Sequence, residues 1–256
     1  MIFYLGTHHA TQRWFDLAVP LFVSRRVLAA RKTLPETLPS LTDWALDSGG
    51  FTELSLYGEW RTSVYQYVSD VWRFAQMGCL AWVAPQDWMC EPFMLQKTGL
   101  TVADHQERTV RNFLDLRQLL GSLVIPVLQG WELDDYRRCW EMYAKAGVDL
   151  EKEALVGLGS VCRRQNTSEA GTIVRSLAPL KLHYFGAKLT GLESFGDALA
   201  SADSMAWSVD ARWRAAHGEP PPRGCTHKSC ANCPRYAIRW RQLALARFDQ
   251  LRLEVA

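Results

Sequence analysis

The sequence lacks any long apolar run. None of its 256 residues belong to a stretch near the roughly 20 apolar residues that a membrane-spanning helix needs. The opening segment, MIFYLGTHHATQ, turns polar too early for the apolar core of a secretion signal. Internal repeats and low-complexity segments are also absent. We therefore expect a globular, cytoplasmic protein with no membrane partner.

The sequence also lacks a strong charge of either sign. Its 29 Lys and Arg residues nearly balance 27 Asp and Glu residues, which gives a formal net charge of +2. A nucleic-acid-binding surface, if present, must therefore be a local basic patch. Eleven tryptophans exceed what a core of this size usually needs. This excess leaves room for aromatic side chains in a binding site.

Seven cysteines, an odd number, disfavour a disulfide framework and indicate a reducing compartment. Three of them, Cys225, Cys230 and Cys233, lie within nine residues that also include His227. Four such ligands at short spacing allow a loop to surround a tetrahedral zinc ion. Because this cluster is far from the candidate catalytic acids in sequence, we expect a structural zinc. Unligated loop cysteines are the alternative.

Short apolar runs alternate with longer segments of helical periodicity, which predicts parallel strands joined by crossover helices. The runs cover residues 3–5, 21–24, 44–47, 80–84, 124–128, 155–158, 182–185 and 202–205. Eight strands favour a (β/α)8 TIM-like barrel over residues 1–216. A zinc-binding loop and a terminal helix over residues 217–256 would pack on it, forming a single domain. A doubly wound sheet is the alternative, because periodicity does not reveal whether a sheet closes.

Polar residues follow several of these runs. Asp47 leads into Ser48-Gly49-Gly50-Phe51, Asp87 and Gln129 follow the fourth and fifth runs, and Asp203 lies in the eighth. In a barrel the carboxyl ends of all strands meet at one mouth. Carboxylates, an amide and aromatic rings around one pocket suit a flat, polar ring. Two acids can also carry out nucleophilic substitution at a sugar carbon. Each acid alone could instead be a helix cap or an ion-pair partner.

Seven motifs carry a resemblance to a known family. They are LDSGGFTEL, PQDWMCEP, VLQGW, GLGSVCRR, FGAK, DSMAWS and CANC. Their order is similar to that of the tRNA-guanine transglycosylases, with the Asp203-Ser204 pair most like the archaeal branch. The full set resembles the phage and bacterial 7-deazaguanine DNA transglycosylases, which exchange guanine in DNA for a 7-deazaguanine base. The resemblance extends from about residue 3 to residue 233.

The resemblance implies a role for each matching residue. Asp203 matches the nucleophile that attacks C1′ of the target nucleotide, and Asp47 matches the general acid/base. Asp210 lies close enough in sequence to be the alternative nucleophile. The implied substrate-binding residues are Ser48, Gly49, Gly50, Phe51, Asp87, Gln129, Gly157, Leu158 and Phe185. Among them, Asp87 and Gln129 would hold the guanine edge, Gly157 and Leu158 would present backbone groups, and the two phenylalanines would sandwich the ring.

The resemblance also implies partners and a cofactor. The partners would be DNA and a free 7-deazaguanine base, with the 7-cyano form expected. The target base must leave the helix to react, and its phosphates need cations. Candidate cations beyond the strand ends are Arg163, Arg164, Lys188 and Arg212. The tRNA enzymes hold a structural zinc with three close cysteines and a distant histidine. No histidine follows His227 here, so His227 is the expected fourth ligand.

Three other functions remain open from the sequence. The first is the same base exchange on tRNA, which the lack of an appended RNA-binding domain disfavours. The second is a base-excising glycosylase or nucleosidase, with water as the acceptor. The third is a non-catalytic nucleic-acid-binding protein, which the presence of both Asp47 and Asp203 disfavours.

Overall fold

Eight parallel strands form one sheet in the computed structural model, which describes residues 1–35, 43–162, 164 and 168–255, with side chains to residue 249. The strands are β1 (Ile2–Thr7), β2 (Leu21–Ser24), β3 (Trp44–Asp47), β4 (Leu80–Val83), β5 (Val127–Leu128), β6 (Val156–Leu158), β7 (Leu182–Tyr184) and β8 (Ser201–Ser204). All eight predicted runs thus overlap a strand; the bounds agree for β2 and β3 and shift by one to three residues for the other six.

The strand order is β4-β3-β2-β1-β8-β7-β6-β5, and every ladder is parallel. Strands that are consecutive in sequence are neighbours, except β4 and β5 at the two ends of the order, and β1 also pairs with β8. This order rules out the doubly wound alternative, in which the chain reverses direction across the sheet. The sheet is curled, and its two end strands approach each other through one bridge, Val83 to Val124. Pro126 follows and has no N–H to extend a ladder, so β5 begins only at Val127.

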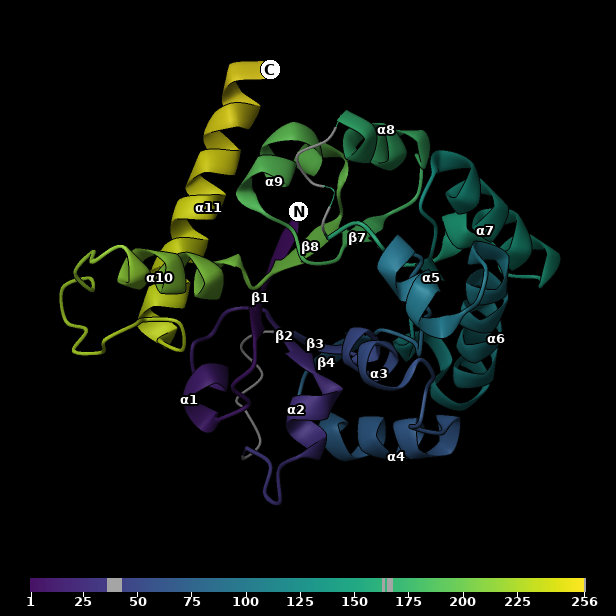
Figure 1. Cartoon of the computed structure of the whole chain (residues 1–256), viewed down its shortest axis with the longest axis horizontal. Coiled ribbons are helices and arrows are strands. Elements are labelled where there is room, and N and C mark those ends of the chain that lie inside the picture. The colour runs from purple at the N-terminus through teal and green to yellow at the C-terminus, as the bar shows by residue number, and fades with distance from the viewer. Residues whose placement is uncertain (36–42, 163, 165–167, 256) are drawn as a thin grey trace.

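Helices follow most strands and cover the outside of the sheet (Figure 1). They are α1 (Gln12–Phe15), α2 (Arg25–Ala29), α3 (Gly50–Tyr57), α4 (Val64–Ala75), α5 (Pro92–Thr98), α6 (Val102–Leu120), α7 (Leu133–Lys145), α8 (Ser168–Ser176), α9 (Leu189–Phe195), α10 (Ala206–Ala216) and α11 (Pro234–Val255). A capping box opens α6, where Thr101 and Asp104 bond each other's backbone. The short link between β1 and β2 holds only the single turn α1.

Alternation along the strands sorts side chains into two layers. Leu5, Val23 and Leu46 point outward into the core between the sheet and the helices. An inner cluster inside the curl contains Tyr4, Phe22, Ala45, Trp82, Ala84 and Ile125. Asp203 pairs with Tyr4 across the ladder, and Asp47 lies two residues beyond Ala45. Both acids therefore point to the inside of the curled sheet.

The last helix ties the C-terminal segment to the first strand. In Figure 1, α11 runs beside α10 and α9, with which it is in contact. The Arg241 guanidinium donates two hydrogen bonds, of 2.9 and 3.1 Å, to the backbone oxygen of Phe3. Phe248 packs against Gly196, where a methyl group would collide with its ring. Among the described helices, none is both long and apolar enough to cross a bilayer.

Candidate active site and metal centre

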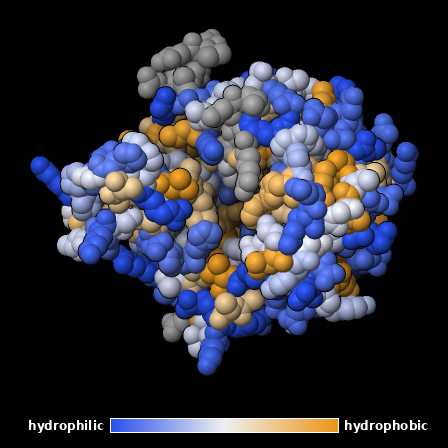
Figure 2. Space-filling view, viewed as in Figure 1, coloured by the Kyte–Doolittle hydropathy of each residue, from blue (hydrophilic) through white to orange (hydrophobic). Residues whose placement is uncertain are grey.

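A cavity of about 240 Å³ lies at the carboxyl ends of the strands. Seven of the predicted site residues line it: Asp47, Ser48, Gly50, Phe51, Asp87, Phe185 and Asp203. Figure 2 shows the face of the molecule drawn in Figure 1, which is hollowed near its middle. The cavity is smaller than the roughly 300–1,000 Å³ typical of drug-sized ligands, and it therefore suits a single bicyclic base.

Asp47 ends β3 and points into this cavity. The backbone of Gly49 and the side chain of Ser24 hydrogen-bond its carboxyl group. Burial raises its pKa above the ordinary value despite these bonds, and the nearby charge of Asp203 raises it further. A carboxyl group with a raised pKa retains its proton at higher pH, which suits a proton donor.

Asp203 lies in β8 and is almost fully buried. Its Oδ1 accepts a hydrogen bond of 2.8 Å from the backbone N–H of Gly186. The Nε2 atom of His183, on β7, lies 3.4 Å from the same oxygen. No hydrogen bond to Oδ2 is found among the residues that the structure describes. One carboxylate oxygen is thus held, while the other can approach a ligand.

A chain of hydrogen bonds connects the polar residues on the other side of the cavity. Asp87 Oδ2 accepts a hydrogen bond of 2.6 Å from Gln129 Nε2, and Oδ1 accepts one of 3.3 Å from the Ser48 hydroxyl. Burial raises the pKa of Asp87 to about 7, with the charge of Asp47 as the second cause. Asp87 lines the cavity, whereas Gln129, which holds it, is fully buried and does not line the cavity.

The same hydrogen-bond network includes two residues, Ser160 and Glu91, that were not predicted as site residues. The Ser160 hydroxyl accepts a bond of 2.6 Å from Cys90 N–H. It lies 2.7 Å from Gln129 Oε1 and 3.1 Å from Glu91 Oε2, so it can donate to either oxygen. Both residues line the cavity and are buried. They belong to the GLGS and PQDWMCEP motifs, so the motifs located them without indicating their roles.

Two phenylalanines present rings to the cavity. Phe185 packs inside the sheet. Its ring centroid lies 5.9 Å from that of Phe22 and 4.7 Å from that of His183. Phe51 lies on α3 with 42% of its surface exposed and contacts Phe93 at 5.9 Å. The partly buried Phe185 ring forms a wall of the cavity, whereas the exposed Phe51 ring lies where a flat ligand could cover it.

Close packing explains the predicted glycines. A methyl group on Gly157 would lie 2.7 Å from the Phe185 ring, and one on Gly159 would lie 2.3 Å from the Gln129 amide. Gly49 has a φ of +80° at the start of α3, a left-handed conformation that favours glycine. The side chain of Leu158 points into the outer core, so only its backbone can face a ligand.

The predicted cations differ in their surroundings. Arg163 lies outside the described residues. Arg164 is buried, pairs with Glu169 and lies over the Trp131 ring at 4.3 Å, so local partners already engage its guanidinium group. Lys188 and Arg212 are exposed. Arg212 is near enough to the cavity residue His8 to lower the pKa of that histidine, after the larger effect of burial.

Asp210, the alternative nucleophile, lies away from this cavity. It is on α10, accepts hydrogen bonds from Tyr236 and Arg214, and lines a separate cavity beside α11. Its partners hold it in a surface ion pair. The geometry therefore favours Asp203 over Asp210 as the acid that can reach a ligand beside Asp47.

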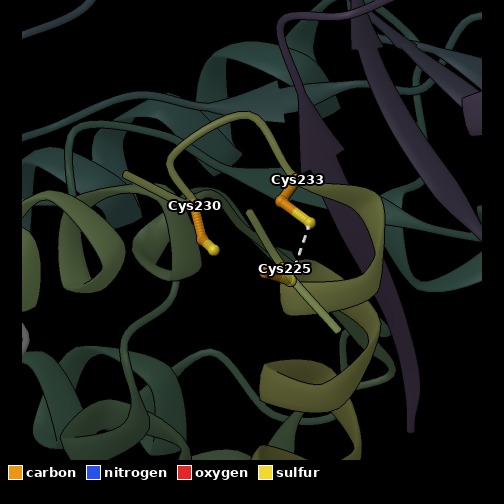
Figure 3. A group of neighbouring side chains, drawn as sticks. All are labelled: Cys225, Cys230 and Cys233. Carbon is orange, nitrogen blue, oxygen red and sulfur yellow. Dashed lines mark hydrogen bonds between the residues drawn. The ribbon is translucent and has the colours of Figure 1, made fainter. Parts of the chain in front are cut away.

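The three clustered cysteines come together at the start of α11 (Figure 3). Their Sγ atoms all lie within 4.8 Å of one another, and those of Cys225 and Cys233 are 3.7 Å apart. Thiolates around a tetrahedral zinc are about 3.8 Å apart, given Zn–S bonds of about 2.3 Å. The donor set could therefore hold a metal ion, as predicted. His227 does not belong to the group, because its side chain is exposed on the bend before Ser229.

Comparison with known proteins agrees with this site. The family model described as DpdA, DeoxyPurine in DNA protein A, matches residues 1–255. A search of curated proteins finds no match. The family match covers almost the entire chain, including the strand-end acids and the cysteine cluster. The chain therefore belongs to the DpdA family, that of the 7-deazaguanine DNA transglycosylases.

Proposed function

We propose that this protein exchanges guanine in DNA for a free 7-deazaguanine base through a covalent intermediate on Asp203. The observation that supports this most strongly is the shared cavity of Asp47 and Asp203. One carboxyl group has a raised pKa, while the other has an oxygen without a partner among the described residues. Asp47 could therefore act as the acid, and Asp203 as the nucleophile, in a substitution at one sugar carbon.

In the first half of the reaction, Asp203 Oδ2 attacks C1′ of the target deoxyguanosine. The C1′–N9 bond breaks, and its electron pair leaves with the guanine. Asp47 donates a proton to the departing base, which leaves as neutral guanine. The sugar is then held as an ester of Asp203, and Asp47 is ionised.

In the second half, the incoming base takes the place of guanine. The Asp47 carboxylate accepts the N9 proton of the 7-deazaguanine, and N9 attacks C1′. The C1′–O bond to Asp203 breaks, which restores the Asp203 carboxylate and the protonated Asp47. No net proton is consumed, so the same two acids serve both halves.

Base recognition follows from the edge groups in the cavity. An ionised Asp87 can accept hydrogen bonds from N1–H and the 2-amino group, while the Gln129 amide can donate to O6. Both guanine and 7-deazaguanine present this edge, so one site can receive either base in turn. Phe185 and Phe51 would cover the ring faces. We propose 7-cyano-7-deazaguanine as the incoming base.

Lys188 and Arg212 would bind the phosphates that flank the flipped nucleotide. Both are exposed; Lys188 follows the cavity residue Gly186 by two positions, and Arg212 affects the pKa of the cavity residue His8. The curled sheet would act as a (β/α)8 barrel with a weak seam between β4 and β5. The three thiolates would hold a structural zinc that fixes the loop before α11. The zinc would supply folding energy and no step of the exchange.

Isotope exchange tests this function. The protein is incubated with labelled guanine and either duplex DNA or tRNA, and the label in each nucleic acid is counted. Label in DNA supports the proposal. Label only in tRNA would mean that the protein acts on tRNA instead of DNA. Release of free base without incorporation would instead indicate a glycosylase. A parallel incubation with 7-cyano-, 7-aminomethyl- and unsubstituted 7-deazaguanine identifies the accepted substituent.

A further inference from the structure

His183 is a polar ring at the centre of the aromatic interior of the sheet. It lies in the middle of β7, with no exposed surface. Its ring centroid is 4.6 Å from that of Trp82, 4.7 Å from that of Phe185 and 5.6 Å from that of Phe22. A buried polar group without hydrogen bonds is costly, so the contacts of its two nitrogens are informative.

The two ring nitrogens face different partners. Nδ1 lies 2.8 Å from the hydroxyl of Ser201, which pairs with His183 across the β7–β8 ladder. Nε2 lies 3.4 Å from Asp203 Oδ1 and makes no well-aligned hydrogen bond. A buried nitrogen without a partner is thus directed at the proposed nucleophile.

The surroundings favour one tautomer. Burial lowers the pKa of His183, and the neighbouring Asp203 only partly opposes this effect, so the ring is neutral and carries one proton. A proton on Nδ1 would leave a lone pair on Nε2 facing the carboxylate oxygen. A proton on Nε2 faces that oxygen favourably, and the Ser201 hydroxyl then donates to Nδ1.

We propose that His183 is a positioning residue that holds Oδ1 of Asp203 together with the backbone N–H of Gly186, so that Oδ2 faces the target sugar. This inference rests on the proposed role of Asp203 as nucleophile. His183 forms no covalent bond and transfers no proton. Its Nε2 atom faces Oδ1 and not the proposed reacting oxygen, Oδ2.

The two donors act in both halves of the exchange. When Oδ2 bonds to C1′, Oδ1 becomes the carbonyl oxygen of the ester and remains between His183 and Gly186. When the ester breaks, negative charge returns to the carboxylate and is shared by Oδ1, where both donors stabilise it. During the attack Asp203 loses its charge, so the two donors act in that half by holding the nucleophile in place; a misplacement of about 1 Å can slow a reaction by about 100-fold.

Variants at His183 separate this role from simple packing. His183→Phe keeps an aromatic ring without a donor, whereas His183→Gln restores an N–H at about the position of Nε2. Tyr4→Phe is the matched control, because Tyr4 packs on the edge of His183 and accepts from Trp82 but does not line the cavity. Single-turnover adduct formation with DNA and the Kd of a 7-deazaguanine base are measured for each variant.

We expect His183→Phe to form the adduct about 100-fold more slowly, because the nucleophile is no longer held in place, with base affinity retained. His183→Gln should form the adduct at least tenfold faster than His183→Phe does. Tyr4→Phe should form it at the wild-type rate. An unchanged rate in His183→Phe, or equal rates in both His183 variants, overturns the inference while leaving the proposed function intact. Absence of an adduct in the wild-type protein instead overturns the proposed function and the inference with it.

A second measurement needs no substitution. Nitrogen-15 NMR of the ring of His183 in the wild-type protein distinguishes its tautomers near neutral pH. A proton on Nε2 is the expected result. A proton on Nδ1 would leave Asp203 without this donor and overturn the inference, even if every variant failed to fold.

Discussion

Asp47 and Asp203 line one cavity, and the charge of Asp203 raises the pKa of Asp47. Their strands, β3 and β8, are separated by β2 and β1 in the sheet. In a flat sheet, three strand spacings of about 4.8 Å would put them about 14 Å apart. Both side chains point to the inside of the curl, which turns them toward each other. The curvature of the sheet thus brings the two proposed catalytic acids together.

Asp47→Asn should stop turnover but retain base binding. An asparagine can still accept the hydrogen bonds from Ser24 and Gly49, but it has no acidic proton to give. We expect the rate of base exchange to fall by about 100-fold or more. The Kd of the base should remain within a few-fold of the wild-type value. Asp134→Asn, an exposed change on α7, is the control. A turnover rate in Asp47→Asn equal to that of the control would remove Asp47 from the mechanism.

Asp87 should make the protein less stable as pH rises. Its pKa in the folded protein is about 7, above the ordinary value of 3.8, so the folded state binds this proton more tightly than the unfolded state does. The contribution of Asp87 to the free energy of unfolding is therefore greatest below about pH 4, and it is lost as the pH rises through about 7.

Asp87→Asn removes the cost of ionisation and should stabilise the protein at high pH. Between about pH 4.5 and about pH 8, its advantage in unfolding free energy over the wild type should grow by on the order of 3 kcal/mol. Urea unfolding at the two pH values measures this. Base affinity should fall, because the NH2 group of asparagine would face an N–H donor of the base where the carboxylate offers a second acceptor oxygen. An advantage that does not grow with pH would show that Asp87 ionises normally.

Gly159→Ala should damage base binding through Gln129. The added methyl group would lie 2.3 Å from the Gln129 amide and displace it from its bond to Asp87. We expect at least a tenfold loss of base affinity by calorimetry, about 1.4 kcal/mol. Gly171→Ala in α8 is the matched control, since its methyl group would meet Phe195 at an ordinary 3.6 Å. Equal affinity in the two variants would mean that Gln129 does not contact the base.

Cys230→Ser should lower the zinc content and the melting temperature, because it removes one of three gathered thiols. Metal analysis after dialysis and thermal unfolding measure the two effects. His227→Ala should leave both unchanged, since this side chain is outside the group. Zinc loss in His227→Ala comparable to that in Cys230→Ser would restore the histidine as a ligand.

Local patterns predicted the elements of the fold because each is encoded by nearby residues. Alternation of apolar runs with segments of helical periodicity located all eight strands. Strand order and curl depend on contacts between distant segments, which periodicity does not report. The motif resemblance supplied Asp47, Asp87 and Asp203 together.

Other parts of the site follow only from three-dimensional contacts. The buried position of Arg164 depends on Trp131 and Glu169, and the direction of the Ser160 hydroxyl depends on Gln129 and Glu91. His183 reads in sequence as an isolated histidine within an apolar run. Only the ladder that pairs β7 with β8 brings it next to Asp203.

Trapping the covalent intermediate tests the central claim most directly. The protein is incubated with DNA and then denatured rapidly, and peptides are sequenced by mass spectrometry. We predict a deoxyribose adduct on Asp203, absent from Asp203→Ala and present in Asp210→Asn, whose acid lies in the separate cavity. An adduct on any other residue, or one that persists in Asp203→Ala, would contradict the account.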